Sequence, residues 1–207
     1  MPRLKVCGIT DAAFAAEAAR RGVDYLGLIF AEGSPRRVTP EQAKAIVAAV
    51  AGATMPPPRF VGVFVEQDVA EIGRLARAVP LDVIQLHGDY GAEEVAELKA
   101  AGYEVWQLCG QDSCAAVADA VLLDGRKGTQ RGGTGTRADW SQVAALKRAG
   151  RRVILAGGIS AANVVAAAAT GADVLDANSA LETSPGRKSV RLLDEFLASM
   201  PRGNMVK

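Results

Sequence analysis

Short runs of apolar residues, many of them β-branched, recur along the whole chain. Eight such runs can be counted: 4–7, 25–30, 60–65, 83–86, 104–108, 121–123, 153–156 and 174–176. Most are nearly continuous in apolar residues rather than alternating with polar ones. That pattern is typical of parallel strands covered on both faces, so it predicts eight buried parallel strands.

The segments between these runs repeat their apolar residues three or four positions apart, which is the helical period. They cover residues 11–21, 39–50, 68–78, 92–101, 112–118, 140–149, 161–169 and 188–199. One start is well marked, because Thr39 can cap a helix, Pro40 suits its first position and Gln42 can close a capping box. Eight helices therefore alternate with eight strands.

Strict alternation of strand and helix predicts an α/β fold with a parallel sheet, either open or closed. An open doubly wound sheet would carry a glycine-rich dinucleotide fingerprint in its first turn. The turn here, residues 7–11, reads Cys-Gly-Ile-Thr-Asp and lacks it. We therefore predict an eight-stranded parallel β/α (TIM) barrel, with residues 1–207 as a single domain because no linker or charge block divides them.

Charge and composition narrow the possible partners. The chain has 24 Lys+Arg against 23 Asp+Glu, a net charge of +1, which argues against nucleic-acid or anionic-membrane partners. The start lacks the apolar core of a signal peptide. The uncharged stretch 153–172 contains glycines and many alanines, and it predicts a strand, a turn and a helix rather than a membrane span. We expect a cytoplasmic protein.

The chain has three cysteines and a single histidine, His87. The three cysteines, Cys7, Cys109 and Cys114, cannot all pair within one chain, and none has a second ligand at metal-binding spacing. These counts indicate a reduced protein without a metal site.

Chemistry in such a barrel belongs to the carboxyl ends of the strands. The candidate side chains there are Cys7, Arg36, His87, Asp124 and Asp176, after strands one, two, four, six and eight. Two small-residue turns follow strands seven and eight, and backbone N–H groups in such turns commonly hold a phosphate. The candidate phosphate-binding residues are Gly157, Gly158, Ser179 and Ala180.

Each candidate also has a plain structural explanation. Cys7 could be a small buried hydrophobe, Asp124 a turn cap and Arg36 a solvated loop charge. His87 reads more as a hydrogen-bonded rim residue than as a proton carrier. A functional site is favoured because the strand order of the barrel places all of these residues at the same carboxyl-end face. The glycine-rich segment 128–136 lacks the lysine of a P-loop and is interpreted as a basic lid.

Several short motifs carry a family resemblance in a fixed order. They are Lys5-Val6-Cys7-Gly8-Ile9-Thr10, Ser34-Pro35-Arg36, Val61-Gly62-Val63-Phe64-Val65, Gln85-Leu86-His87-Gly88, Leu122-Leu123-Asp124, Gly132-Gly133-Thr134-Gly135 before Asp139-Trp140, and Leu155-Ala156-Gly157-Gly158-Ile159 with Asn163-Val164. In these motifs the chain resembles the phosphoribosylanthranilate isomerases over nearly its whole length.

The resemblance implies a cofactor-free Amadori rearrangement of N-(5-phosphoribosyl)anthranilate in tryptophan biosynthesis. It implies that Cys7 is the general base, Asp124 the general acid and Arg36 the group that holds the anthranilate carboxylate. Family members occur as monomers and homodimers, and either state is expected. The chemistry requires a protonated Asp124, which partial desolvation would favour, and some electropositive help for the Cys7 thiolate.

The chain departs from the family pattern at one place that bears on phosphate. The usual Ser-Gly-Val-Glu run reads Ser179-Ala180-Leu181-Glu182 here, and the extra methyl group could crowd the phosphate. Ala180 thus favours the alternative of a non-catalytic phosphosugar-binding barrel. The related isomerase of histidine biosynthesis uses two aspartates. The first strand here ends in Cys7 instead of an aspartate, which argues against that enzyme. The barrel that closes the indole ring uses a lysine acid, which no strand end here clearly offers.

Overall fold

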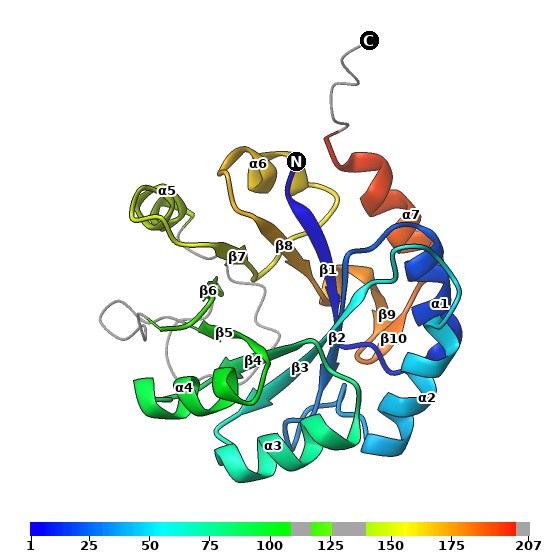
Figure 1. The fold of residues 1–207 in the computed structure, drawn as a ribbon. Helices are drawn as coiled ribbons and strands as arrows, with labels where there is room; N and C mark the ends of the chain where they lie inside the picture. The colour runs from blue at the N-terminus through cyan, green and yellow to red at the C-terminus, as the bar shows by residue number, and fades with distance from the viewer. Residues whose placement is uncertain (109–116, 126–139, 202–207) are drawn as a thin grey trace.

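A computed structural model describes residues 1–108, 117–125 and 140–201. Its eight parallel strands form one closed barrel in chain order, with β8 pairing back onto β1 (Figure 1). The strands are β1 (Arg3–Cys7), β2 (Tyr25–Ile29), β3 (Arg59–Val65), β4 (Val83–His87), β5 (Glu104–Leu108), β6 (Ala120–Leu123), β7 (Val153–Leu155) and β8 (Val174–Ala177). The predicted TIM barrel is confirmed.

Helices surround the strands on the outside, as Figure 1 shows. They are α1 (Ala12–Arg20), α2 (Pro40–Val50), α3 (Val69–Ala78), α4 (Ala92–Ala100), α5 (Ser141–Arg148), α6 (Val164–Ala169) and α7 (Val190–Ser199). Most of the predicted helix 112–118 lies outside the described residues.

Two predicted helix starts can be compared with the structure. The capping box before α2 is confirmed, because Gln42 N donates to Thr39 Oγ1 at 3.2 Å and Thr39 N donates to Gln42 Oε1 at 2.8 Å. The prediction of a helix over residues 161–169 was wrong at its start, because α6 begins at Val164. The Asn163 side chain instead accepts from Ser160 N at 2.9 Å and donates to Gly158 O at 2.8 Å, which holds 160–163 in a turn before α6.

The strands separate two apolar layers. In β3, Val61 and Val63 face the barrel interior, whereas Phe60 and Phe64 pack outward against the helices. The interior is filled near the amino ends of the strands by Tyr25 and Trp106, whose ring centroids lie 5.1 Å apart in an edge-to-face arrangement. Near the amino ends of the strands the barrel interior is therefore a packed core rather than a pore.

A group of charged and aromatic residues closes the amino end of the barrel, and we call it the floor cluster: Arg3, Tyr25, Arg59, Glu104, Trp106 and Arg152. Glu104 forms ion pairs with Arg59 and Arg152 and accepts from Trp106 Nε1 at 2.5 Å. The Tyr25 hydroxyl accepts from Arg152 at 2.7 Å and from Arg3 at 2.9 Å.

An aspartate precedes every second strand of the barrel. Each accepts a hydrogen bond from a backbone N–H of the preceding strand, over 2.7–2.9 Å. The pairs are Asp24 with Leu4, Asp82 with Phe60, Asp119 with Val105, and Asp173 with Val153. Because a buried N–H without a partner is costly, this repeated contact secures alternate strands at the amino end.

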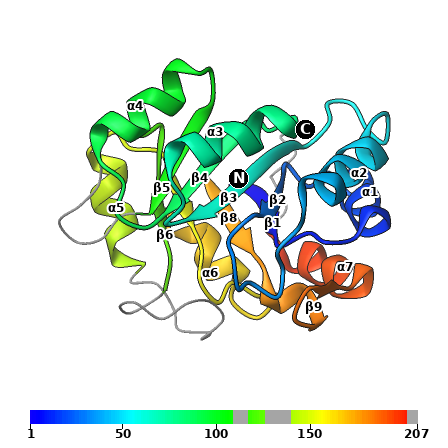
Figure 2. The ribbon, with the colours of Figure 1, turned by 90° about the horizontal axis from the view of Figure 1, so that it is seen from below.

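A small hairpin follows β8 and was not predicted. A 3₁₀ turn, η1 (Ser179–Leu181), leads into β9 (Glu182–Ser184) and the antiparallel β10 (Arg187–Lys188). Figures 1 and 2 place the hairpin on the same side of the molecule as α1, α2 and α7.

One finding bears on the expected absence of a membrane span. Among the helices that the structure describes, none has both the length and the apolar character needed to cross a bilayer.

Candidate active site

A cavity of about 1020 Å³ opens at the carboxyl ends of the strands. Its wall includes most of the residues that the sequence nominates, drawn from six different strand ends: Cys7, Arg36, His87, Asp124, Gly157, Gly158, Asp176 and Ser179. Ala180 is not among the described residues of the wall. The volume suits a ligand of drug-like size or somewhat larger.

Cys7 ends β1 and is buried, with 5% of its surface exposed. A methyl group on the facing Gly27 would lie 2.8 Å from Cys7 Sγ, so only glycine leaves room for the thiol there. Burial raises the pKa of Cys7, while the ammonium groups of Lys5 and Lys188 act to lower it and the Asp176 carboxylate to raise it. Burial outweighs the two ammonium groups, so the net shift of the Cys7 pKa is upward.

Lys5 and Asp176 form a buried ion pair beneath Cys7, with Lys5 Nζ 2.6 Å from Asp176 Oδ2. Burial disfavours the charge on Lys5, but the Asp176 carboxylate outweighs it and the pKa of Lys5 is raised. Burial also raises the pKa of Asp176. Asp176 Oδ1 has no hydrogen-bond partner in the described structure, although Asp176 belongs to the cavity wall. A ligand hydroxyl could supply the missing donor.

Asp124 follows β6 and is half-buried beside the turn after β7. A methyl group on Gly157 would lie 2.3 Å from Gly125 N and 2.8 Å from Asp124 Oδ1, and Gly157 has a φ of +85°. Only glycine satisfies both the close approach and the left-handed conformation. Gly157 thus allows the two turns to meet and brings the Asp124 carboxyl to the cavity.

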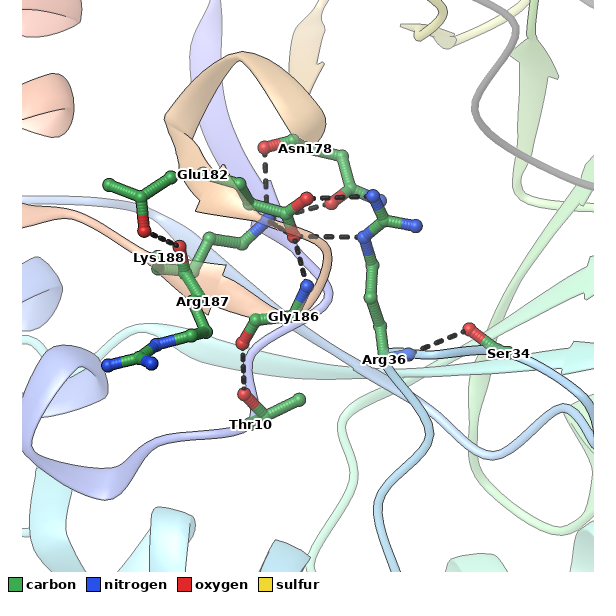
Figure 3. A network of polar contacts seen from close by, with 9 residues as sticks. Thr10, Ser34, Arg36, Asn178, Glu182, Gly186, Arg187 and Lys188 are labelled. Carbon is green, nitrogen blue, oxygen red and sulfur yellow. Dashed lines mark hydrogen bonds and ion pairs between the residues drawn. The ribbon is translucent and has the colours of Figure 1, made fainter.

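Arg36 is not a solvated loop charge, because its guanidinium is held by the hairpin (Figure 3). Arg36 Nε lies 2.8 Å from Glu182 Oε1 and Arg36 Nη2 lies 2.7 Å from Glu182 Oε2. Lys188 Nζ contacts the same carboxylate at 2.8 Å and donates to Asn178 Oδ1 at 2.7 Å. We call these four residues, Arg36, Asn178, Glu182 and Lys188, the Arg36 cluster.

His87 ends β4 and is 7% exposed. Its Nε2 lies 2.7 Å from Gln85 Nε2, which projects into the same barrel interior. A ring nitrogen already engaged in a hydrogen bond supports the prediction of a hydrogen-bonded rim residue.

Several polar residues around the cavity were not nominated from sequence: Lys5, Asn178, Glu182 and Lys188. A signal for Lys5 exists, because residues two apart in a strand point to the same face, and Lys5 therefore shares the interior with Cys7. Glu182 and Lys188 are cross-strand partners in the short hairpin, and no apolar alternation marks that hairpin.

Some predicted features lie outside the described residues, namely Cys109, Cys114 and the lid segment 128–136. Within the described part of the chain, no group of three or more potential ligands is arranged to hold a metal ion.

A closed β/α barrel with a thiol, a carboxyl group and cations around one carboxyl-end cavity has the architecture of a barrel enzyme. A model of the N-(5'-phosphoribosyl)anthranilate (PRA) isomerase family matches residues 4–199. The chain belongs to this family and is an isomerase.

Individual relatives agree with the family match. The N-(5'-phosphoribosyl)anthranilate isomerase of Rubrobacter xylanophilus is 38% identical over 208 residues, which cover 96% of this chain and 98% of that protein. The crystal structure of the Thermus thermophilus enzyme has a TM-score of 0.80 at 37% identity and covers 95% of this chain and 97% of its own. A phosphoribosyl anthranilate isomerase solved with reduced 1-(o-carboxyphenylamino)-1-deoxyribulose 5-phosphate has a TM-score of 0.77 at 27% identity, covering 96% and 98%.

Proposed function

We propose that this isomerase converts N-(5-phosphoribosyl)anthranilate into 1-(2-carboxyphenylamino)-1-deoxyribulose 5-phosphate, an Amadori rearrangement of tryptophan biosynthesis in the cytoplasm. The observation that carries the proposal is that Cys7, Asp124 and Arg36 line one cavity in a chain of this family. One chain supplies that wall, so a monomer or a homodimer can each hold a full site.

The first step opens the ribose ring, with Asp124 as general acid. The carboxyl proton goes to the ring oxygen as the bond from C1 to that oxygen breaks, and the substrate nitrogen supplies the electron pair that forms a C1=N iminium. Asp124 lies at the wall next to Gly157, where a partly desolvated carboxyl can remain protonated.

The second step removes the C2 proton, with Cys7 as general base. The electron pair of the C–H bond forms a C1=C2 double bond and the iminium nitrogen becomes neutral, so the substrate itself is the electron sink. Tautomerisation then moves the O2 proton to C1 and leaves the ketone at C2. No electrons enter or leave, and the scheme needs neither a cofactor nor a metal.

The remaining nominated residues bind rather than react. We assign Arg36 to the anthranilate carboxylate and the unpartnered Asp176 Oδ1 to a ribose hydroxyl. His87 contributes to the wall. The phosphate is assigned to the turns with Gly157, Gly158, Ser179 and Ala180. Lys5 and Lys188 supply the electropositive help that the Cys7 thiolate needs.

The experiment is to add the protein to freshly made substrate and follow the loss of anthranilate-type fluorescence. We expect turnover by the wild type, and we expect Cys7→Ala and Asp124→Asn each to lower kcat about 10²–10⁴-fold. Asp194→Asn on the exposed face of α7 is the matched control and should keep full activity. Binding of the product analogue without turnover would instead favour the non-catalytic phosphosugar-binding barrel.

A further inference from the structure

The Arg36 cluster contains more buried charge than is needed to hold the Arg36 guanidinium, for which one carboxylate would be enough. Glu182 and Lys188 leave only 4% and 1% of their side chains exposed, and Arg36 leaves 12%. Burying a charge is costly unless it is paired, so a cluster of this kind is maintained for a reason. Neither Glu182 nor Lys188 is used as a base, an acid or a direct ligand in the scheme above.

Arg36 is held so that one of its two forks remains available. A guanidinium can grip a carboxylate through Nε with one Nη atom, or through both Nη atoms. Glu182 takes the first fork, with both contacts below 3 Å. In the described structure no side chain accepts a hydrogen bond from Nη1, which Figure 3 shows pointing away from Glu182. The second fork is therefore free for a carboxylate in the cavity.

Two further contacts fix the direction of that fork. Arg36 Cδ packs so closely on Gly8 that a methyl group there would lie 2.8 Å away. The hairpin turn is tied to the loop after β1 by Thr10 Oγ1, which donates to Gly186 O at 2.6 Å. Since Gly8 directly follows Cys7, the orientation of Arg36 is set relative to the thiol.

The charges of the Arg36 cluster do not balance. Arg36 and Lys188 are cations and Glu182 is the anion between them, so the cluster carries one excess positive charge. The Lys188 ammonium donates its three hydrogen bonds to Glu182 and Asn178, over 2.7–3.0 Å. It therefore has no donor left for a ligand, and its effect on one is through charge. An anionic group at the free fork of Arg36 would complete the balance.

We propose that Glu182 and Lys188 are positioning residues that make the site selective for an ortho-carboxylated aryl amine. Glu182 directs the free fork of Arg36, and Lys188 neutralises Glu182 so that Arg36 keeps its attraction for the substrate carboxylate. This inference rests on the proposed function, because the carboxylate is that of anthranilate.

The test measures binding of three unreactive analogues by calorimetry. They are the reduced product analogue with a 2-carboxyphenyl group, its 4-carboxyphenyl isomer and the plain phenyl compound. For the wild type we expect the 2-carboxyphenyl analogue to bind about 10- to 100-fold more tightly than the phenyl one, the range typical of charge-assisted hydrogen bonds. Lys188→Met should remove most of that preference, since the Glu182 charge then opposes the ligand, and leave phenyl binding unchanged.

The double variant Glu182→Gln/Lys188→Met restores the excess charge and should regain affinity for the carboxylates, which a purely structural role would not allow. Glu182→Gln alone should bind both carboxylates but lose discrimination between the 2- and 4-isomers. If Lys188→Met does not fold, Glu182→Gln and the double variant still test orientation against charge.

Equal weakening of all three analogues in Lys188→Met, or unchanged isomer discrimination in Glu182→Gln, would overturn the inference. Turnover is a separate readout. A wild type that distinguishes the analogues without converting substrate contradicts the proposed function, whereas an active wild type with insensitive variants contradicts only this inference.

Discussion

The two ends of the barrel each hold a group of paired charges, but these charges have different roles. At the amino end, both oxygens of Glu104 are taken by Arg59, Arg152 and Trp106. At the carboxyl end, Asp176 Oδ1 has no partner in the described structure and the Arg36 cluster has one cation in excess. A cluster whose hydrogen bonds and charges are paired internally stabilises the fold. A cluster with an unpaired acceptor or an excess charge can bind a ligand.

The ends also differ in how tightly they are packed. The rings of Tyr25 and Trp106 in the floor cluster fill the barrel interior at the amino end. Around the cavity, glycines occupy the positions where a larger residue would collide with a site side chain. Gly8 lies against Arg36, and Gly27 faces Cys7. The same closed sheet thus has a stable end and a functional end, and substitutions should separate them.

The largest effect should come from Gly27→Ala. The new methyl group would lie 2.8 Å from Cys7 Sγ and 3.2 Å from Lys5 Cε, so it must displace the thiol. We expect kcat/KM to fall about 10²-fold, the cost of a small misplacement of a reacting group. Steady-state kinetics and thermal unfolding of the same sample measure the two effects separately.

Gly62→Ala is the matched control, because its methyl group would lie 2.6 Å from Leu81 Cδ1 and 2.8 Å from Phe64 in the outer core. Both variants should lose about 1–3 kcal/mol of unfolding free energy through overpacking. Only Gly27→Ala should lose activity, and comparable inactivation by Gly62→Ala would refute the assignment of Cys7 to the site.

Glu104→Gln should have the opposite profile, with stability lost and activity kept. Burial acts to raise the pKa of Glu104, but hydrogen bonds from Trp106 and Arg59 and the charges of Arg152 and Arg59 outweigh it, so the pKa is lowered. The carboxylate therefore contributes stability above its unfolded pKa of about 4.3 and loses it as pH falls through the folded value.

At neutral pH we expect Glu104→Gln to lower the unfolding free energy by about 1–2 kcal/mol, a figure that allows for screening at the partly exposed rim. Urea denaturation at several pH values measures this, with Glu97→Gln on the exposed face of α4 as control. The difference between wild type and Glu104→Gln should shrink in acid. A pH-independent difference would mean that packing, not charge, is responsible.

The sequence predicted the barrel and its rim better than the polar connections between them. Eight runs of apolar residues were enough for the strands, because buried parallel strands leave a local signal. Lys5 leaves only its spacing from Cys7, which places it on the interior face; its partner Asp176 is 171 residues away and leaves no local signal. Glu182 and Lys188 lie in strands of two or three residues, too short for any periodicity.

The Asp residues before alternate strands are a different case. They are visible in the sequence, but their role can be recognised only once the fold is known. Asp24, Asp82, Asp119 and Asp173 each stand directly before an apolar run, and a turn residue is the ordinary interpretation. Only the closed sheet shows that each accepts an N–H from the neighbouring strand.

The smallest effect concerns the ionisation of Cys7. We compare the removal of one lysine at the carboxyl end of the barrel with the removal of one at the amino end. The charged groups that act on Cys7 are Lys5, Asp176, Lys188 and Arg36. Removing the cation that lowers the Cys7 pKa most, in Lys5→Met, should raise the pKa of the thiol further. Lys99→Met, which removes the partner of Asp119 at the amino end, should leave that pKa unchanged.

The measurement is the rate of Cys7 alkylation by iodoacetamide against pH, followed by mass spectrometry of the Cys7 peptide. Only the thiolate reacts, so the rate rises with pH and its midpoint reports the pKa. For the wild type the midpoint should lie above that of an unstructured cysteine, since burial dominates. In Lys5→Met it should move to still higher pH while the limiting rate stays the same. An unmoved midpoint would show that Lys5 holds Asp176 and does not act on the thiol.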